Sequence, residues 1–226
     1  RRPGGRGSRD CALRQGDADR CGGFLIPGHG PPAFDVGERV VVPYLGWRGI
    51  RKIDKILLSH PHPDHYGGLG AILSRFPVGE LWWNGQTFPD STFKDLTAQV
   101  EKIPHRVLRA GDRMNWEGME IEVFYPESVD FRRSINDNSL VMRLRYGEVG
   151  FLFTGDVEKK GERFLVDLPK SLTADVMKIP HHASRTSSSP AFIEKVSPRF
   201  VVASLGEANP FHFPHPGVLE RYEGRK

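Results

Sequence analysis

The sequence has little cysteine and no long hydrophobic run. Its two cysteines, Cys11 and Cys21, lie within the first 22 of 226 residues and form no C-x-x-C motif. This spacing gives no disulfide framework and no cysteine-based zinc site. No stretch reaches the ~18 consecutive apolar residues that a membrane-spanning helix needs. We therefore expect a soluble domain, or a soluble piece of a longer protein.

The chain also lacks a strong charge excess outside its first residues. The net charge is +4, and residues 1–22 supply +3 of it through six arginines and three aspartates. A basic tail of this kind can attract phosphate groups, and it equally fits an ordinary solvated tail. The remaining residues are nearly neutral, so charge alone does not identify a nucleic-acid-binding protein.

Short apolar segments bounded by Gly and Pro predict a mixed α/β domain. Residues 40–44 form one such run. We predict strands at 55–59, 80–83, 120–124, 139–146, 151–154, 174–179 and 199–205, and helices at 69–76, 89–103, 156–168, 190–196 and 216–222. The strands at 139–146 and 151–154 are joined by a Gly-containing turn, which predicts a β-hairpin. This mixture favours two sheets covered by helices.

Histidine is concentrated where chemistry is expected. Seven of the nine histidines fall in three short segments, and His29 and His105 stand apart, so we interpret those two as structural. The strongest signal is residues 59–65, Ser-His-Pro-His-Pro-Asp-His, directly after an apolar strand. His60 and His62 are two apart and face the same way in an extended chain, whereas the turn that follows directs Asp64 and His65 elsewhere. This spacing suits two adjacent divalent ions.

Three further segments deliver ligand-type side chains at the ends of predicted elements. Asp156 follows a hydrophobic strand and a glycine that permits close approach, so it could bridge two metals as well as cap the following helix. His181 and His182 follow the strand at 174–179, and adjacent side chains point in different directions. One of them can therefore bind metal while the other contacts substrate. His215 precedes the last predicted helix.

These motifs resemble the metallo-β-lactamase superfamily. Within it, four segments are similar to the C-terminal hydrolase domain of the ComEC family of bacterial DNA-uptake channels: 34–40 (FDVGERV), 58–69 (LSHPHPDHYGGL), 136–141 (NDNSLV) and 180–188 (PHHASRTSS). The resemblance covers about residues 30–222. It implies a four-layer αββα sandwich, with the metal site in loops at the strand ends.

The resemblance also implies two divalent metal ions, zinc or manganese. His60 and His62 would hold one ion and Asp64 and His65 the other, with Asp156 between them and His182 as a further ligand. Asp64, His181 and His215 are candidate catalytic residues. Asn138, Ser184 and Arg185 are candidate substrate contacts, together with Thr186. We expect a phosphodiesterase that cuts DNA, in single-stranded form, during competence-related uptake.

Some features leave other interpretations open. Arg143 and Arg145 could contact DNA. Trp82 and Trp83 could stack on bases or pack in the core. The same metal chemistry would serve a small-molecule hydrolase acting on a thioester or phosphodiester. The chain could also be an inactive fragment, which binds DNA without cutting it or does not fold.

The resemblance further implies a longer membrane protein. Such a protein would hold this domain at the outer face of the plasma membrane, next to a membrane channel portion. Residues 1–29 carry only a disturbed version of the family's first strand, whereas residues 30–226 carry the domain. The family's closing strand does not appear before Lys226. We therefore expect a sandwich that is incomplete at both ends.

Overall fold

The first sheet contains three parallel strands with their crossover helices on one side. The computed structural model describes residues 34–206 and 209–224. The strands lie in the order β1 (Ile53–Leu58), β2 (Val78–Trp83) and β3 (His105–Val107). Parallel strands need long connections. The connections here carry α2 (Pro63–Tyr66), α3 (Leu69–Arg75) and α4 (Ser91–Val100). Residues Gly37–Val41 and α1 (Val42–Trp47) precede the sheet as consecutive π- and α-helical turns.

The second sheet is larger and mixed. Its six strands lie in sequence order: β4 (Arg113–Trp116), β5 (Met119–Tyr125), β6 (Val141–Tyr146), β7 (Val149–Phe153), β8 (Val176–Lys178) and β9 (Phe200–Val202). The pairs from β4 to β7 are antiparallel, whereas β7, β8 and β9 run parallel. The β6–β7 pair confirms the predicted hairpin. Helices α5 (Lys159–Asp167), α6 (Pro190–Val196) and α7 (Pro216–Glu223) complete this half.

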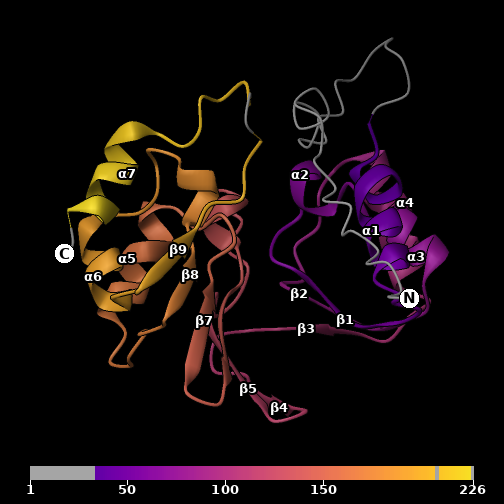
Figure 1. Ribbon diagram of the computed structural model, residues 1–226, viewed down its shortest axis with the longest axis horizontal. Coiled ribbons are helices and arrows are strands. Elements are labelled where there is room, and N and C mark those ends of the chain that lie inside the picture. The colour runs from indigo at the N-terminus through magenta and orange to yellow at the C-terminus, as the bar shows by residue number, and fades with distance from the viewer. Residues whose placement is uncertain (1–33, 207–208, 225–226) are drawn as a thin grey trace, which may run out of the picture.

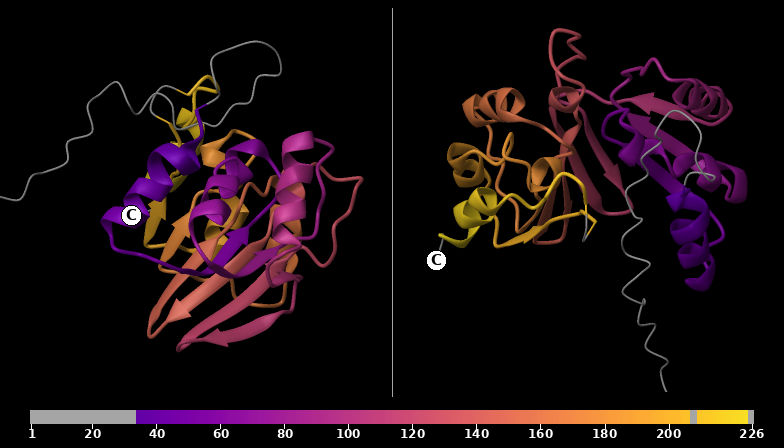
Figure 2. Two further views of the ribbon diagram at one scale, coloured as in Figure 1. Left: turned by 90° about the vertical axis from the view of Figure 1, so that its right-hand side faces the viewer. Right: turned by 90° about the horizontal axis from the view of Figure 1, so that it is seen from above.

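The hydrophobic core is divided into layers by the two sheets. One cluster joins the small sheet to α3 and α4 and includes Leu58, Leu81 and Phe93. A second joins the large sheet to α5 and α6. Between the sheets lies a third, in which Trp82 of β2 meets Val123 of β5. Figures 1 and 2 show the helices on the outer sides of the two sheets. This arrangement confirms the four-layer αββα sandwich, and it places Trp82 in the core.

Several expected elements differ in extent from those observed. The apolar run at 40–44 is helical, the predicted helix at 89–103 is the shorter α4, and the strand at 199–205 is only β9. Asp156 does not cap a helix, because α5 begins at Lys159 with Glu158 in the N-cap position. The Asp156 carboxylate is directed toward two histidines instead. The expected segment 1–29 lies outside the described residues.

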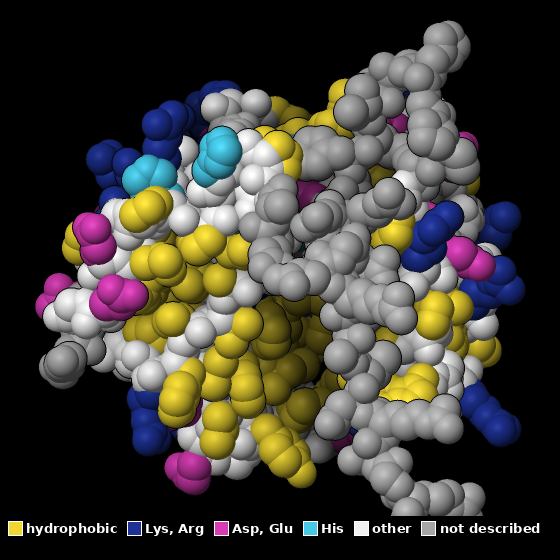
Figure 3. All heavy atoms as spheres, turned by 45° about the horizontal axis from the view of Figure 1, so that its top comes forward, with side chains coloured by type: hydrophobic (Ala, Val, Ile, Leu, Met, Phe, Trp, Pro, Cys, Tyr) yellow, Lys and Arg dark blue, Asp and Glu magenta, His cyan; other side chains and the backbone are white. Residues whose placement is uncertain are grey.

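Apolar side chains are exposed on the outermost strand of the large sheet. Phe200, Val201 and Val202 form all of β9 and are all exposed. Figure 3 shows hydrophobic side chains gathered in a hollow on the face that it draws. Among the described residues, no helix has the length and apolar character needed to cross a membrane.

Candidate metal centre

The first part of the site is the loop that leaves β1. His60 is completely buried, and its Nε2 lies 3.1 Å from Nδ1 of His62. Its other nitrogen, Nδ1, lies 3.1 Å from the hydroxyl oxygens of both Ser59 and Ser139. The ring is thus held from one side and presents Nε2 to His62. The chain then enters α2, which carries Asp64 and His65.

The second part is the turn after β7. Gly155 has φ of +52°, and a Cβ there would lie 2.6 Å from the Cβ of Ser139, so no larger residue fits. The neighbouring Asp156 is buried, with its backbone N–H donating to Ser139 Oγ at 3.0 Å. Lys178 of β8 lies 3.5 Å from Asp156 Oδ1 and donates to the carbonyl of Gly155. These contacts fix the carboxylate at the end of the strand.

The third part is the turn after β8, where backbone strain accompanies the site. His181, His182 and Ala183 are consecutive non-glycine residues with positive φ. Such conformations cost about 1–3 kcal/mol each and cluster at functional sites. His182 Nδ1 donates to the carbonyl of Ser204. Because Nδ1 carries the proton in the neutral ring, Nε2 is the nitrogen with a free lone pair. Nε2 is directed toward the carboxylates of Asp64 and Asp156.

Four of these side chains converge on one point. Single ligand atoms of Asp64, His65, Asp156 and His182 all lie within 4.8 Å of one another. Nε2 of His65 and Nε2 of His182 lie 3.2 and 3.1 Å from Asp156 Oδ2, and His182 Nε2 lies 3.2 Å from Asp64 Oδ2. Atoms that bind a tetrahedral ion at about 2.05 Å would lie roughly 3.3 Å from one another. The three distances above are close to that separation.

The surroundings of Nε2 of His65 and Nε2 of His182 show whether these residues could bind a metal. Nε2 of His65 and Nε2 of His182 are buried and make no hydrogen bond of acceptable geometry with any described residue. Buried polar atoms without a partner are rare and require an explanation. Two imidazole nitrogens and two carboxylates form a donor set suited to zinc or manganese. The residues therefore fit a divalent ion.

The pKa values of the first two histidines agree with a ligand role. Burial lowers the pKa of His60 and of His62. Both rings are therefore neutral near pH 7, and a neutral imidazole is the form that binds a metal.

The pKa values within the four-residue cluster show why it attracts a cation. Burial opposes charge on Asp156, but His182 and His65 beside it hold the pKa of its carboxyl well below the usual range. Burial likewise opposes charge on His182, yet Asp156 and Asp64 raise its pKa to about 10. Two carboxylates thus face each other across one cation-binding position.

His60 and His62 form a neighbouring pair of candidate ligands, and Asn136 lies on the same side of the site. Asn136 begins a short 3-10 turn, Asn136–Asn138, before β6. Its Oδ1 is buried and without a hydrogen-bond partner among the described residues, and its Nδ2 lies 3.4 Å from His181 Nε2. The sequence interpretation missed Asn136. The NDN motif at residues 136–138 pointed to this segment, but it does not show which of the two asparagine amides faces the site.

Asn138, the expected substrate contact, faces the protein interior. Its side chain is completely buried, accepts from the N–H of Asp130 and donates to the carbonyls of Asp130 and Ser134. These three hydrogen bonds hold the loop before β6 in place. The expected substrate contact through this amide is not present in this structure, because the side chain is fully buried.

His181 lies beside the four-residue cluster and is positioned by an acidic partner. Its Nδ1 lies 3.3 Å from Glu158 Oε1 and 3.1 Å from Thr186 Oγ1. Contact with His181 holds the pKa of Glu158 down at about 2. The carboxylate favours the proton on Nδ1 and leaves Nε2 facing Asn136. The two adjacent histidines thus point in different directions, as expected. The ring of His182 lies in the cluster and the ring of His181 lies next to it.

The remaining expected residues are placed less centrally. His215 is exposed at the start of α7, and its backbone N–H, rather than its ring, contacts this region by donating to the Ala183 carbonyl. Ser184 is buried and lies 3.0 Å from Thr186 Oγ1, whereas Arg185 is exposed. Arg143 binds Glu122 on the large sheet and two backbone carbonyls, so it is engaged away from the cluster.

Comparison with known proteins agrees with this geometry. The family model described as "Metallo-beta-lactamase superfamily" matches residues 34–206, which include all four members of the cluster. The chain belongs to the metallo-beta-lactamase superfamily. A solved structure of the metallo-beta-lactamase fold protein YhfI from Bacillus subtilis matches 76% of this chain and 75% of its own. The sequence identity is 15% and the TM-score 0.47.

Two curated relatives match this chain over most of its length. "ComE operon protein 3" of Bacillus subtilis is 32% identical over 189 residues, covering 83% of this chain and 24% of the relative. "Competence protein ComA" of Neisseria gonorrhoeae is 35% identical over 196 residues, covering 83% of this chain and 26% of the relative. These matches confirm the resemblance drawn from the motifs. The chain spans about a quarter of the length of these relatives.

Proposed function

We propose that this domain is a metal-dependent phosphodiesterase that cuts single-stranded DNA. The observation that carries the proposal is the convergence of Asp64, His65, Asp156 and His182 on one point. Two buried imidazole nitrogens there lie beside carboxylates but make no hydrogen bond of acceptable geometry with a described residue. Separate loops supply these groups, and no purely structural need accounts for gathering them. The family match supports a hydrolytic role.

The site has ligands for two divalent ions, zinc or manganese. His60 and His62 would hold one, together with the orphaned Oδ1 of Asn136. Asp64, His65 and His182 would hold the other, and Asp156 would be shared. Such ions act as Lewis acids and lower the pKa of bound water from 15.7 to about 7, which supplies a nucleophile at neutral pH.

The protein's own groups orient the substrate. His181 is held at Nδ1 by Glu158, so its Nε2 is left facing Asn136, and the doubly protonated ring could donate from Nε2 to a phosphate oxygen. The Asn136 amide lies beside it. Arg185 is exposed four residues from His181, and a guanidinium binds phosphate in bidentate fashion. His215 and Ser184 remain candidates for contacts further from the reacting phosphorus.

The choice of DNA depends on the relatives, because metals and hydroxide serve lactams, thioesters and phosphodiesters alike. One relative is named a competence protein, and both are about four times as long as the match. We propose that this chain is the hydrolase part of such a longer protein. It would act on DNA beside a membrane channel, at the outer face of the plasma membrane.

The test is cleavage of end-labelled single-stranded DNA by the purified chain with manganese, with zinc, or with chelator. Asp156→Asn is the site variant. Asp167→Asn, which changes an exposed carboxylate at the end of α5, is the matched control. We expect metal-dependent cutting by the wild type and the control, and loss of more than a hundredfold in Asp156→Asn.

The other outcomes discriminate between functions. A folded, metal-loaded protein that leaves DNA intact but hydrolyses a thioester would overturn the DNA assignment in favour of a small-molecule hydrolase. A protein that folds but binds no metal would overturn the hydrolase proposal altogether.

A further inference from the structure

A cavity of about 560 Å³ opens beside the candidate metal centre. Its walls come from the segment after β2, the first turns of α4, and the loop between β5 and β6. The volume is in the range of roughly 300–1,000 Å³ that is typical of ligand sites. None of the metal-ligand candidates lines the cavity, so it is a separate feature of the surface.

One ring contact and one chain connection link the cavity to the metal centre. Phe88, which lines the cavity, packs edge-on against the ring of His62 with centroids 6.0 Å apart. On the opposite wall, Ile135 precedes Asn136, the residue with the orphaned oxygen in the site. The cavity therefore borders the side of the metal centre that carries His62 and Asn136.

The cavity offers aromatic rings and positive charge together. Phe88 and Phe131 contribute accessible rings, whereas Phe93 is buried in the core beneath them. Lys94 is an exposed cation, and Arg133 adds a second cation that is paired with Asp130. None of the described residues that line it carries a carboxylate. Rings combined with cations and no acid are complementary to a nucleotide, since bases stack on aromatic faces while phosphates pair with Lys and Arg.

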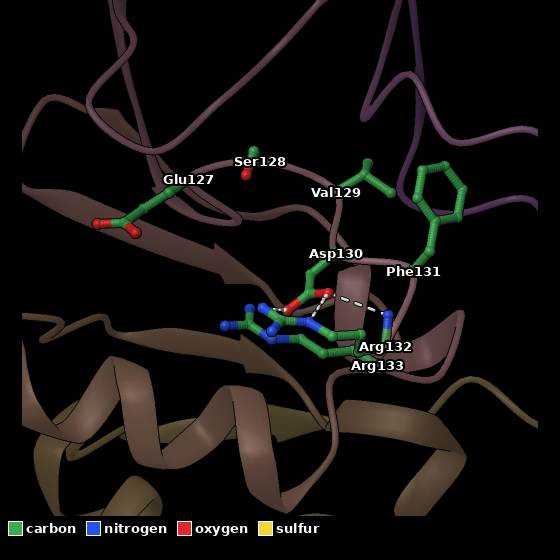
Figure 4. A pocket seen from close by; sticks show the side chains of 7 residues that line it. All are labelled: Glu127, Ser128, Val129, Asp130, Phe131, Arg132 and Arg133. Atoms are coloured by element: carbon green, nitrogen blue, oxygen red, sulfur yellow. Dashed lines mark hydrogen bonds and ion pairs between the residues drawn. The ribbon is translucent and has the colours of Figure 1, made fainter.

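Phe131 is the most informative of these residues. Its side chain is 79% exposed on the rim, although the loop that carries it is well anchored. Asp130 is bound through its backbone by the buried side chain of Asn138. The Asp130 carboxylate pairs with both Arg132 and Arg133, which ties these side chains to the loop. Figure 4 shows Phe131 turned away from these three side chains. A fixed loop thus presents a bare aromatic ring next to the site.

We propose that this cavity binds one nucleotide of single-stranded DNA adjacent to the phosphodiester that is cut. The base stacks on Phe131 or Phe88, and Lys94 with Arg133 attracts the phosphate. This inference rests on the proposed nuclease function and names the part of the site that selects its substrate. A base paired in a duplex is already stacked on its neighbours and cannot enter, so the cavity favours single strands.

The test measures binding and cleavage separately. Binding of a fluorescein-labelled oligothymidylate to the full chain is followed by anisotropy in chelator, where no cutting occurs. We expect Phe131→Ala to weaken binding about tenfold, the effect of losing one base–aromatic stack. Phe131→Tyr restores it. Trp47→Ala is the matched control, because Trp47 on α1 is 80% exposed and does not line the cavity. Lys94→Gln should reduce the salt dependence of binding.

With metal present, Phe131→Ala should raise the KM for DNA about tenfold, whereas Trp47→Ala should leave the KM unchanged. If DNA is cut but Phe131→Ala behaves like Trp47→Ala, the nucleotide site is overturned and the nuclease stands. If oligothymidylate binding depends on Phe131 but no DNA is cut, the nucleotide site stands and the nuclease proposal fails.

Discussion

The hydroxyl of Ser139 lies 3.1 Å from Nδ1 of His60 and holds that buried ring in place. The same oxygen accepts a hydrogen bond from the backbone N–H of Asp156. One side chain therefore positions candidate ligands from two loops that are far apart in sequence. Partners of this kind fix the orientation of metal ligands, and their loss typically costs about 10–100-fold in metal affinity.

Replacing this hydroxyl should weaken metal binding without unfolding the protein. We expect Ser139→Ala to lower the affinity for zinc by about 10–100-fold, measured by competition with a chromogenic chelator. Ser74→Ala is the control, since the Ser74 hydroxyl on α3 donates to the Ala71 carbonyl of its own helix. Equal affinities in the two variants would show that Ser139 does not orient the ligands.

Gly155 should tolerate no side chain. An alanine there would combine a positive φ with a Cβ that lies 2.6 Å from the Cβ of Ser139. We expect Gly155→Ala to reduce the free energy of unfolding by about 2–4 kcal/mol and to displace Asp156. Gly46→Ala in α1 is the matched control, because a Cβ at Gly46 would have no described atom within 4 Å. Urea denaturation of both variants distinguishes them, and similar midpoints would contradict the packing argument.

We expect Asn136 to affect metal binding and Asn138 to affect the stability of the fold. Asn136→Ala removes an amide that has no structural partner for its oxygen, so we expect about a 10–100-fold loss of metal affinity or turnover with little change in stability. Asn138→Ala removes three buried hydrogen bonds, so we expect a loss of about 2 kcal/mol or more in stability. Thermal unfolding and metal titration of both variants make the comparison. The reverse pattern would assign the site to Asn138.

The metal-free protein should lose stability as the pH rises. Asp156 and Asp64 raise the pKa of His182 from 6.5 to about 10, so its charged form stabilises the fold fully below pH 6.5. That contribution is lost progressively as the pH approaches 10. Urea denaturation in chelator at about pH 6, 7.5 and 9 should show a steeper decline in wild type than in His182→Asn. Parallel curves would mean that His182 is not paired with the carboxylates. Bound metal should flatten the wild-type curve, because a ligating imidazole stays neutral.

Local sequence was enough to identify the strongest features of the site. The apolar strand before His60 and the spacing of His60, His62, Asp64 and His65 predicted a metal-binding loop, since ligand types at such intervals have few other uses. The structure brings Asp64 and His65 of this loop into the candidate cluster. The hairpin of β6 and β7 was also predictable, because alternation and a glycine turn are local properties. Gly155 before Asp156 correctly indicated a close backbone approach.

Which distant side chains meet depends instead on the tertiary structure. Asn136 and Asn138 share one motif, and the sequence could not tell the buried amide from the one facing the site. Asp156 looks like a helix cap in sequence, yet its carboxylate turns toward His65 and His182, which come from two other loops. The cavity with Phe131 likewise joins three separate segments. Local pattern fixes the period and the turn of each element, whereas convergence depends on how the two sheets pack, and that is a property of the whole core.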